Sequence, residues 1–380
     1  MSPRPTAPLL ALIACATLLA ACSSGAASPA SSPTARATPS ARPTPSPVPA
    51  VTIVPASDPT ETPAAATSGD AVCPDPYVTP VAPPPTPDLA STPAEGTATP
   101  VRIRRTDVTP APPAPAASTT AIRPPLALVP APDLERMLDE RLGDQAQHYA
   151  LVVQDLDDGR GVAINADHVF YAASLFKLEV LYDVFAQRDA GLLDFGERYV
   201  ATGYYSGFDL GPHLVQPCST TSIADLLSAM TSVSDNVAAV MLQDRAGAGR
   251  INDAMAALGL TDTRLTADGT LPATAADMAR LVEAIDRGRG LAPGSPGEML
   301  ELMTHEQSAD RIPADLPQGT RVAHKTGNWD TATHDAGIVY GPRGTYLMVL
   351  MSDQGFASDA APTEAALAKI AFDYFEGAQP

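Results

Sequence analysis

The chain has 380 residues, 45% of them hydrophobic, and a formal net charge of −19 at pH 7. This length accommodates one large domain or two smaller ones. The acidic balance argues against binding to nucleic acid or to an anionic lipid surface, because both partners are themselves negatively charged.

Residues 1–21 have the features of a secretory signal peptide. A single basic residue, Arg4, precedes an apolar run from Leu9 to Leu19 that is too short and too weakly flanked to be a membrane span. The small residues before Cys22 resemble the bacterial lipoprotein signal, in which the cysteine is lipidated and becomes the first residue of the mature chain. We therefore expect an extracytoplasmic protein anchored to the membrane through a lipid on Cys22, with plain secretion as the alternative.

Residues 22–130 are expected to form a disordered linker that begins at the anchoring cysteine. They contain 26 of the 40 prolines, and Ala, Ser and Thr make up most of the remainder. Such a composition buries too little apolar surface to offset the conformational entropy lost on folding. The segment is therefore predicted to act as a tether that holds residues 131–380 away from the membrane.

The charged residues and the remaining cysteines follow this division. Residues 131–380 hold 17 basic and 36 acidic residues and therefore carry the whole net charge.

Cys15 would be removed with the signal peptide, which leaves Cys73 and Cys218 either to pair in an oxidising compartment or to remain unpaired. No Cys/His cluster has the spacing of metal ligands, so neither a metal nor another cofactor is expected.

Residues 131–380 are predicted to form one α+β domain. Hydrophobic periodicity and turn residues predict, in order, a helix at 132–146 with Asp133 as its candidate N-cap, strands at 149–155 and 161–164, a helix that starts near Ser174, a mostly helical region at 222–286, strands at 321–326, 336–340 and 345–351, and a helix at 363–375. An antiparallel sheet built from the two terminal segments around a helical insert has this order of elements.

Ser174 and Lys177 are the first candidate catalytic residues. At a spacing of three residues, a hydroxyl and an amine lie on the same side of a helix. The residues from Leu178 to Phe185 leave almost no polar face. The helix is therefore expected to be buried, and desolvation should lower the pKa of the Lys177 amine towards the range of a general base. The alternative is structural, with Ser174 as a helix cap and Lys177 as an ordinary first-turn residue.

Two further motifs follow in the chain. A Ser-Asp-Asn sequence at 234–236 begins an apolar helix, where Asp235 is expected to be the cap, and a Lys-Thr-Gly sequence at 325–327 lies on the first late strand. Each sequence alone is common at helix caps and strand ends. Together with the Ser-x-x-Lys sequence at 174–177, in this order and on these elements, they form a specific set.

This set of motifs resembles that of the class A β-lactamases and related penicillin-recognising serine enzymes. The resemblance extends from about residue 132 to 376 and includes sequence between the motifs, such as Thr221–Thr231 and Leu316–Gly319. It implies a β-lactamase-like α+β fold, with the sheet packed against an all-helical subdomain, and a serine hydrolase. It also implies a small-molecule partner, either a β-lactam or a peptidoglycan stem peptide. We expect the protein to be a monomer.

The resemblance also implies an acyl-enzyme mechanism. Ser174 would attack an amide carbonyl with Lys177 as the base, and the backbone N–H groups of Ser174 and Asn328 would form the oxyanion hole. Ser234 would relay a proton to the leaving nitrogen, aided by the positive field of Lys325.

The implied substrate-binding residues come from the same segments. Lys325, Thr326 and Arg311 would bind a substrate carboxylate. Gly327 belongs to the same binding strand, and Asn236 would contact the amide on the acyl side of the substrate.

One motif of the family pattern, Glu-x-x-Leu-Asn, is missing. Class A β-lactamases deacylate with a glutamate and an asparagine on a loop between the second and third motifs. Residues 258–278 contain no glutamate, and the loop is shortened. Asp268 is the only carboxylate near the corresponding position, and its side chain is one methylene shorter than that of glutamate.

Three hypotheses stay open at this point. The protein is a class A-like β-lactamase with weak or atypical deacylation, a D,D-peptidase-like cell-wall hydrolase or esterase, or a penicillin-binding or sensing lipoprotein with little turnover. The residues for acylation are present in each case, and the hypotheses differ in how the acyl-enzyme is released.

Overall fold

The computed structural model describes residues 126–208, 210–354 and 357–377. The predicted signal peptide, the lipidation at Cys22 and most of the proline-rich linker lie outside these residues. Cys218 is disulfide-bonded. Because it is the only cysteine among the described residues, its partner lies outside them, and pairing with Cys73 stays a prediction. No helix within the described ranges is long and apolar enough to cross a membrane.

A six-stranded sheet joins the two ends of the domain, as the order of the predicted elements indicated. Its strands are β1 Val129–Pro130, β2 Tyr149–Asp155, β3 Arg160–Ile164, β8 Arg321–Trp329, β9 Ala332–Tyr340 and β10 Thr345–Ser352. They lie in the order β1-β3-β2-β10-β9-β8, and each neighbouring pair is antiparallel except β1 and β3. β2 therefore pairs with the C-terminal strand β10, with Val152 opposite Val349, and β8 forms an open edge.

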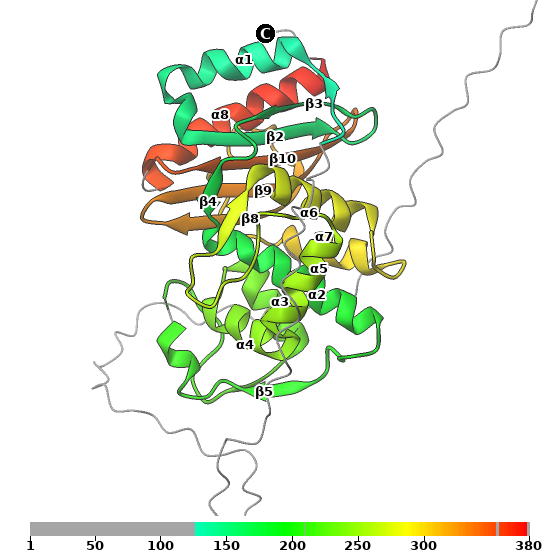
Figure 1. Cartoon of the computed structure of the whole chain (residues 1–380), viewed down its shortest axis with the longest axis vertical. Coiled ribbons are helices and arrows are strands. Elements are labelled where there is room, and N and C mark those ends of the chain that lie inside the picture. The colour runs from blue at the N-terminus through cyan, green and yellow to red at the C-terminus, as the bar shows by residue number, and fades with distance from the viewer. Residues whose placement is uncertain (1–125, 209, 355–356, 378–380) are drawn as a thin grey trace, which may run out of the picture. The chain divides into compact units, whose positions relative to one another are not determined.

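Helices cover both faces of this sheet (Figure 1). α1 Pro132–Leu142 and α8 Ala357–Glu376 pack together on one face, where their apolar side chains form a core with Leu151 and Val153 of β2. The intervening residue Val152 belongs to the larger core on the other face. Because both of its faces are buried, β2 is almost continuously apolar and shows no alternation with polar residues.

The other face carries the helical part of the domain (Figure 1). Its helices are α2 Phe176–Asp189, α3 Ile223–Ser232, α4 Asn236–Ala246, α5 Ala248–Ala257, α6 Ala275–Arg287 and α7 Ser295–Met303. α2 is buried along most of its length and contacts each of the other five. The buried helix predicted after Ser174 is therefore confirmed, and it is the central helix of this part.

The predicted first helix needs two corrections. Ala131 is the N-cap and makes no side-chain capping bond, so Asp133 lies in the first turn and is not the cap. Pro132 occupies the first helical position, where proline is favoured because its φ is already helical and its missing N–H needs no partner. The helix also ends early, because the 3₁₀ helix η1 Gly143–His148 follows and its glycine has a φ of 51°.

Short strands that were not predicted interrupt the helical part. β4 Val169–Tyr171 pairs with β7 Pro272–Thr274, and β5 Arg198–Val200 pairs with β6 Thr220–Ser222. A further 3₁₀ helix, η3 Tyr205–Phe208, lies between β5 and β6. Residues 258–271, predicted within a mostly helical region, form neither helix nor strand. Three-residue strands are too short to produce a recognisable hydrophobic period.

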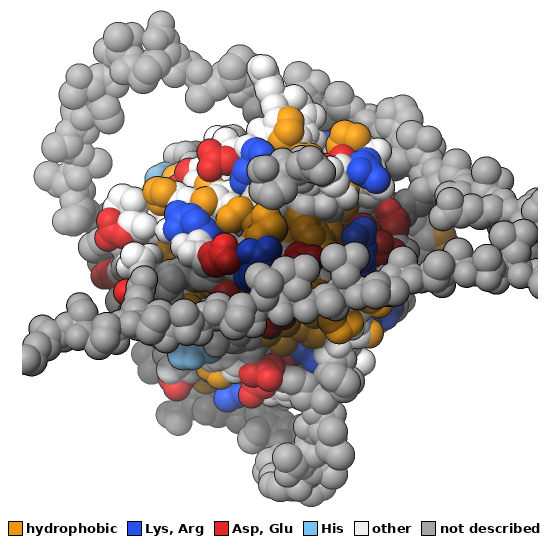
Figure 2. Space-filling view, turned by 90° about the horizontal axis from the view of Figure 1, so that it is seen from above, with side chains coloured by type: hydrophobic (Ala, Val, Ile, Leu, Met, Phe, Trp, Pro, Cys, Tyr) orange, Lys and Arg blue, Asp and Glu red, His pale blue; other side chains and the backbone are white. Residues whose placement is uncertain are grey.

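The net negative charge is not gathered into one patch on the face seen from above α1. Acidic and basic side chains are interspersed there (Figure 2). Ion pairs between Arg136 and Glu140 on α1 and between Lys369 and Asp373 on α8 contribute to this pattern.

Candidate active site

Ser174 lies where the chain enters the central helix. It is the middle residue of a 3₁₀ helix, η2 Ala173–Leu175, that leads into α2, and it is partly exposed. The preceding Ala173 has a φ of 46°, a left-handed conformation that is strained for a residue with a side chain. Lys177 follows in the first turn of α2 and is 1% exposed. The hydroxyl of Ser174 is thus within reach of solvent while the neighbouring amine is buried.

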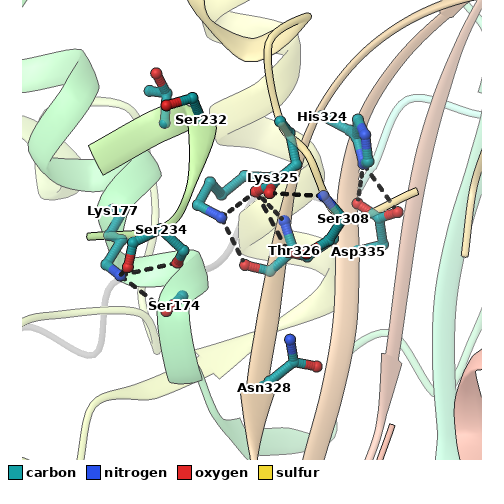
Figure 3. A network of polar contacts seen from close by, with 12 residues as sticks. Ser174, Lys177, Ser232, Ser234, Ser308, His324, Lys325, Thr326, Asn328 and Asp335 are labelled. Carbon is teal, nitrogen blue, oxygen red and sulfur yellow. Dashed lines mark hydrogen bonds and ion pairs between the residues drawn. The ribbon is translucent and has the colours of Figure 1, made fainter. Parts of the chain in front are cut away.

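Four oxygen atoms surround the amine of Lys177. Ser174 and Ser234, which supply three of them, lie beside Lys177 in Figure 3. Its Nζ lies 3.0 Å from Ser174 Oγ, 2.9 Å from Ser234 Oγ, 2.5 Å from the Ser234 carbonyl oxygen and 2.7 Å from Asn236 Oδ1. The structure therefore brings the first and second motifs together at this nitrogen.

The surroundings of Lys177 favour a neutral amine. Burial lowers the pKa of its amine well below the usual range, and the positive charge of Lys325 lowers it further. A neutral amine has two N–H donors and one lone pair. The carbonyl oxygens of Ser234 and Asn236 only accept hydrogen bonds, so they take both donors. The lone pair is then left to accept a proton from a hydroxyl group, and that of Ser174 is in contact.

The second motif is held in a tight turn between α3 and α4. Ser234 has a φ of 60°, and Asp235 is the N-cap of α4, where its Oδ1 accepts a hydrogen bond from Ala238 N at 2.9 Å. Its other oxygen accepts from the backbone N–H groups of Leu214 and Val215. The predicted capping by Asp235 is confirmed, and the same carboxylate ties the preceding loop to the motif.

Asn236 is oriented by that same loop. Its Nδ2 donates to the carbonyl oxygen of Leu210 at 2.7 Å. Because the amide nitrogen is committed to this bond, Oδ1 is the atom that faces Lys177.

The third motif lies on β8, the open edge of the sheet, directly beside the turn that holds Ser174. A side chain at Gly327 would meet the carbonyl oxygen of Ala172 at 3.1 Å and the nitrogen of Leu175 at 3.3 Å. Glycine is therefore needed for β8 and η2 to approach this closely. Thr326 and Asn328 are two residues apart, so their backbone N–H groups point to the same open edge.

Lys325 is paired with a carboxylate that no sequence motif indicated. Its Nζ donates to Glu306 Oε2, and both side chains are 1% exposed. The same oxygen accepts from Thr326 N at 3.4 Å and Thr326 Oγ1 at 3.3 Å, while Ser308 N donates to Glu306 Oε1 at 3.2 Å. Burial lowers the pKa of the Lys325 amine, and Glu306 opposes that shift. Glu306 follows α7, and only the fold carries it to β8.

Arg311 does not reach the surface of the site. Its side chain is fully buried, its Nη2 donates to the side-chain oxygen of Asn328, and its Nη1 donates to the His334 carbonyl oxygen at 3.4 Å. Its Nε lies 3.8 Å from Glu364, a buried carboxylate on α8. Arg311 thus supports Asn328 from the interior, and a direct contact with a substrate carboxylate stays a prediction.

Asp268 is not turned towards the nucleophile by any hydrogen bond. It is exposed, and its carboxylate accepts from Thr270 N at 3.1 Å and Thr270 Oγ1 at 2.9 Å. These hydrogen bonds lower the pKa of Asp268, which makes it a weaker base. Within the described residues, no carboxylate oxygen forms a hydrogen bond with Ser174 or Lys177, and no group of three or more His, Cys, Asp or Glu residues could hold a metal ion.

Two other buried carboxylates interact near the base of this loop. Asp277 on α6 accepts hydrogen bonds from the backbone N–H groups of residues 261–263 and anchors the loop. Glu179 on α2 has one oxygen without a hydrogen-bond partner. Burial raises the pKa of Glu179 to about 8, and the charge of Asp277 adds to the shift.

Helices cover both faces of the sheet, and the three motifs meet beside Ser174. Together these features define a β-lactamase-like domain. The model of the family described as "Beta-lactamase enzyme family" matches residues 133–375, and the chain belongs to that family. The predicted α+β fold is confirmed.

Several known proteins are similar to this domain. The extended-spectrum β-lactamase PER-1 of Pseudomonas aeruginosa is 23% identical over 264 residues, which cover 63% of this chain and 86% of PER-1. The structure of PBP-A is similar with a TM-score of 0.61 and 26% identity, over 67% of this chain and 99% of PBP-A. A β-lactamase from Sphaerobacter thermophilus shares the fold, with a TM-score of 0.60 and 22% identity over 65% of this chain and 98% of its own. The domain is therefore class A β-lactamase-like.

Proposed function

We propose that this protein is a class A-like serine hydrolase whose Ser174 is acylated by β-lactams and by acyl-D-alanyl-D-alanine-like amides, and whose deacylation is slow. The environment of Lys177 carries this proposal, because a buried amine with a free lone pair lies 3.0 Å from the hydroxyl of Ser174. Membership of the β-lactamase enzyme family supports the same chemistry.

Acylation begins with attack of Ser174 Oγ on the amide carbonyl carbon while Lys177 Nζ accepts the hydroxyl proton. The bond between carbonyl carbon and nitrogen then breaks. The proton passes from Lys177 through Ser234 Oγ, which lies 2.9 Å away, to the leaving nitrogen. The products are an ester of Ser174 and a free amine.

The backbone N–H groups of Ser174 and Asn328 are assigned to the oxyanion hole. The close approach of β8 to η2 at Gly327 supports this assignment, as does the direction of the Asn328 N–H towards the open edge. One donor of this kind contributes about 3 kcal/mol of transition-state stabilisation. The bond from Arg311 to the Asn328 side chain would hold that residue in place.

Slow deacylation follows from the hydrogen bonding at Ser174 and Lys177, because no carboxylate oxygen of the described residues bonds to either of them. Hydrolysis of the ester needs a base that deprotonates water, and Asp268 is exposed and bonded to Thr270 instead. A mutant of the related PBP-A was solved as an acyl-enzyme complex with penicillin G. We expect the acyl-enzyme of this protein to persist long enough for isolation.

Intact-protein mass spectrometry after exposure to penicillin G tests the proposal. The wild type should gain the mass of one penicillin within minutes, and Ser174→Ala should gain none. Ser219→Ala is the matched control, because the Ser219 hydroxyl donates to the Gln216 carbonyl oxygen at 2.6 Å and belongs to no motif. This control should be labelled like the wild type. Persistent labelling of Ser174→Ala would refute the assignment of the nucleophile.

A D,D-peptidase-like activity on peptidoglycan stems is the second candidate. Among the described residues, no carboxylate bonds to Ser174 or Lys177. This favours an acyl-transferring enzyme of that kind, because an acyl-enzyme that water attacks slowly can pass its acyl group to an amine instead. Steady turnover of nitrocefin would identify a β-lactamase. Release of D-alanine from a pentapeptide with little nitrocefin turnover would identify the peptidase, and a stoichiometric nitrocefin burst alone would indicate a penicillin-binding sensor.

We infer an extracytoplasmic location, with a lipid on Cys22 as the anchor and the proline-rich segment as the tether. The lipoprotein-like sequence before Cys22 supports this inference, and a disulfide at Cys218 fits an oxidising compartment. Labelled palmitate should be incorporated by the wild type in bacteria and lost in Cys22→Ser. Equal labelling of both proteins would remove Cys22 as the anchor.

A further inference from the structure

The donors of the third motif already contact a carboxylate of the protein itself. Lys325 and Thr326 are the residues to which the family resemblance assigns a substrate carboxylate. In the structure, Glu306 Oε2 accepts hydrogen bonds from Lys325 Nζ, Thr326 N and Thr326 Oγ1. An incoming carboxylate would therefore have to share these donors with Glu306 or replace it.

Glu306 is firmly held in this position. Its side chain and that of Lys325 are each 1% exposed, and Ser308 N fixes its other oxygen at 3.2 Å. Separating a buried ammonium from its carboxylate leaves an uncompensated charge, which costs several kcal/mol. A weakly bound ligand does not supply that energy, so Glu306 is expected to stay in place.

Glu306 neutralises the charge of Lys325, and the other basic residues nearby do not supply a positive charge in its place. Arg311 is fully buried between Asn328 and Glu364. The amine of Lys177 is 1% exposed and is enclosed by oxygen atoms of Ser174, Ser234 and Asn236. Among the described residues at the three motifs, each basic side chain is therefore already in contact with oxygen atoms of the protein.

We propose that Glu306 is a specificity-determining residue that makes this site prefer acyl donors without a free carboxylate beside the scissile amide, such as esterified or amidated compounds. A carboxylate at Thr326 would lie against Glu306, and two carboxylates on one ammonium repel each other. A neutral ester or amide group meets no such repulsion, because it carries no negative charge to oppose that of Glu306. The proposal rests on the proposed function, since it concerns the substrate of the same nucleophile.

Equilibrium binding to Ser174→Ala tests this preference without acylation. The probes are one cephalosporin as the free acid and the same compound as its methyl ester, and calorimetry measures both dissociation constants. The acid should bind about tenfold more weakly than the ester, which is the effect expected of one unfavourable charge contact. Adding Glu306→Gln keeps an oxygen acceptor for Lys325 and removes the negative charge, so the acid-to-ester ratio of dissociation constants should fall by about tenfold.

Glu301→Gln is the matched control for the loss of one negative charge. Glu301 lies on α7, is 43% exposed and pairs with Arg321 at 2.8 Å, so its replacement should leave the ratio within about twofold because exposed charges are well screened. Melting temperatures establish that each variant is folded. If Glu306→Gln does not fold, Glu306→Asp serves as the second variant, because it withdraws the carboxylate by one methylene and should lower the ratio by a smaller factor.

An acid-to-ester ratio near one in the Ser174→Ala parent overturns the proposal, and so does a ratio that Glu306→Gln leaves unchanged. Failure of both probes to bind the parent and the double variant overturns it as well. Failure of the proposed function is seen separately, as an absence of covalent labelling in the wild type, and leaves the binding ratio measurable.

Discussion

The surroundings of Lys177 and of Lys325 differ chiefly in one group, a carboxylate. Both lysines are 1% exposed. Lys177 meets hydroxyl and carbonyl oxygens, whereas Lys325 meets Glu306. Burial lowers the pKa of both amines, and the lowering is greater at Lys177, where the charge of Lys325 adds to it. The charge of Glu306 opposes the shift at both lysines, but only Lys325 also forms a hydrogen bond with it. Lys177 is thus better suited to act as a base, and the ion pair favours the ammonium form of Lys325.

This difference bears on the proposed slow deacylation. A carboxylate in contact with Lys177 would stabilise its ammonium form and remove the lone pair that the proposed acylation requires. Within the described residues, no carboxylate oxygen forms a hydrogen bond with Lys177 or Ser174. The surroundings that favour a neutral amine are thus those expected of a site that is acylated readily and deacylated slowly.

The largest expected effect comes from removing the neutral amine. Lys177→Met should slow acylation by penicillin G by about 10²–10⁴-fold, the usual contribution of a general base. In the wild type, the acylation rate should fall as the pH drops through the lowered pKa of Lys177, since the ammonium has no lone pair. The rates are measured by mass spectrometry over a range of pH. An unchanged pH profile in Lys177→Met would show that another group is the base.

The next prediction compares how the loss of each lysine changes the stability of the fold. Lys325→Met should destabilise the fold by about 3–5 kcal/mol, because it leaves the buried Glu306 carboxylate unpaired. Lys177→Met removes a buried amine that has no carboxylate among its hydrogen-bond partners and leaves acceptors of Ser234 and Asn236 unpaired, so it should cost a smaller amount, about 1–3 kcal/mol. Urea unfolding measures both values. A double variant, Lys325→Met with Glu306→Leu, should recover most of the loss, and equal effects of the two single variants would contradict the comparison.

The third prediction concerns Glu179, a buried carboxyl group, and the pH dependence of stability. Burial raises its pKa to about 8 from 4.5, so the folded state keeps a proton that the unfolded state has released. This contribution to stability is complete below pH 4.5 and is lost as the pH rises towards 8. Glu179→Gln resembles the protonated form. It should lose less stability than the wild type between about pH 5 and pH 8, by on the order of 3 kcal/mol.

Urea unfolding of wild type and Glu179→Gln at both pH values checks this expectation. Glu283→Gln is a suitable control, because Glu283 is partly exposed and pairs with Arg289 at 2.9 Å. Parallel loss of stability in Glu179→Gln and the wild type would show that Glu179 does not hold a proton in the folded state.

The smallest effect is expected at the loop between the second and third motifs. Asp268→Asn should leave the lifetime of the acyl-enzyme within about twofold of the wild type, because an exposed carboxylate bonded to Thr270 is a weak base. The lifetime is followed by the loss of penicillin mass from the labelled protein. A clearly longer lifetime in Asp268→Asn would assign water activation to Asp268.

Local sequence patterns predicted those parts of the fold that local forces determine. β2 was predicted at 149–155 and is found there, because a run of buried apolar residues marks a strand covered on both faces. β8 was predicted to end at Thr326 but continues to Trp329 through pairing with β9. Its last residues have no apolar period, so only the partner strand reveals them.

In the candidate site, too, some features could be predicted from local sequence and others only from the folded structure. Asp235 could be predicted as a cap because helix capping involves residues three apart. The burial of Arg311 against Asn328 and Glu364 could not, since Glu364 lies on α8, which packs behind the sheet only in the folded chain.

The amino-acid sequence by itself determined the three motifs, the elements that carry them and the absence of a glutamate from the 258–278 loop. The tertiary structure decided how far the pKa of each lysine is lowered. A pKa depends on which groups the fold brings into contact, and these come from afar in the chain: Ser234 lies 57 residues from Lys177, and Glu306 lies 19 residues from Lys325.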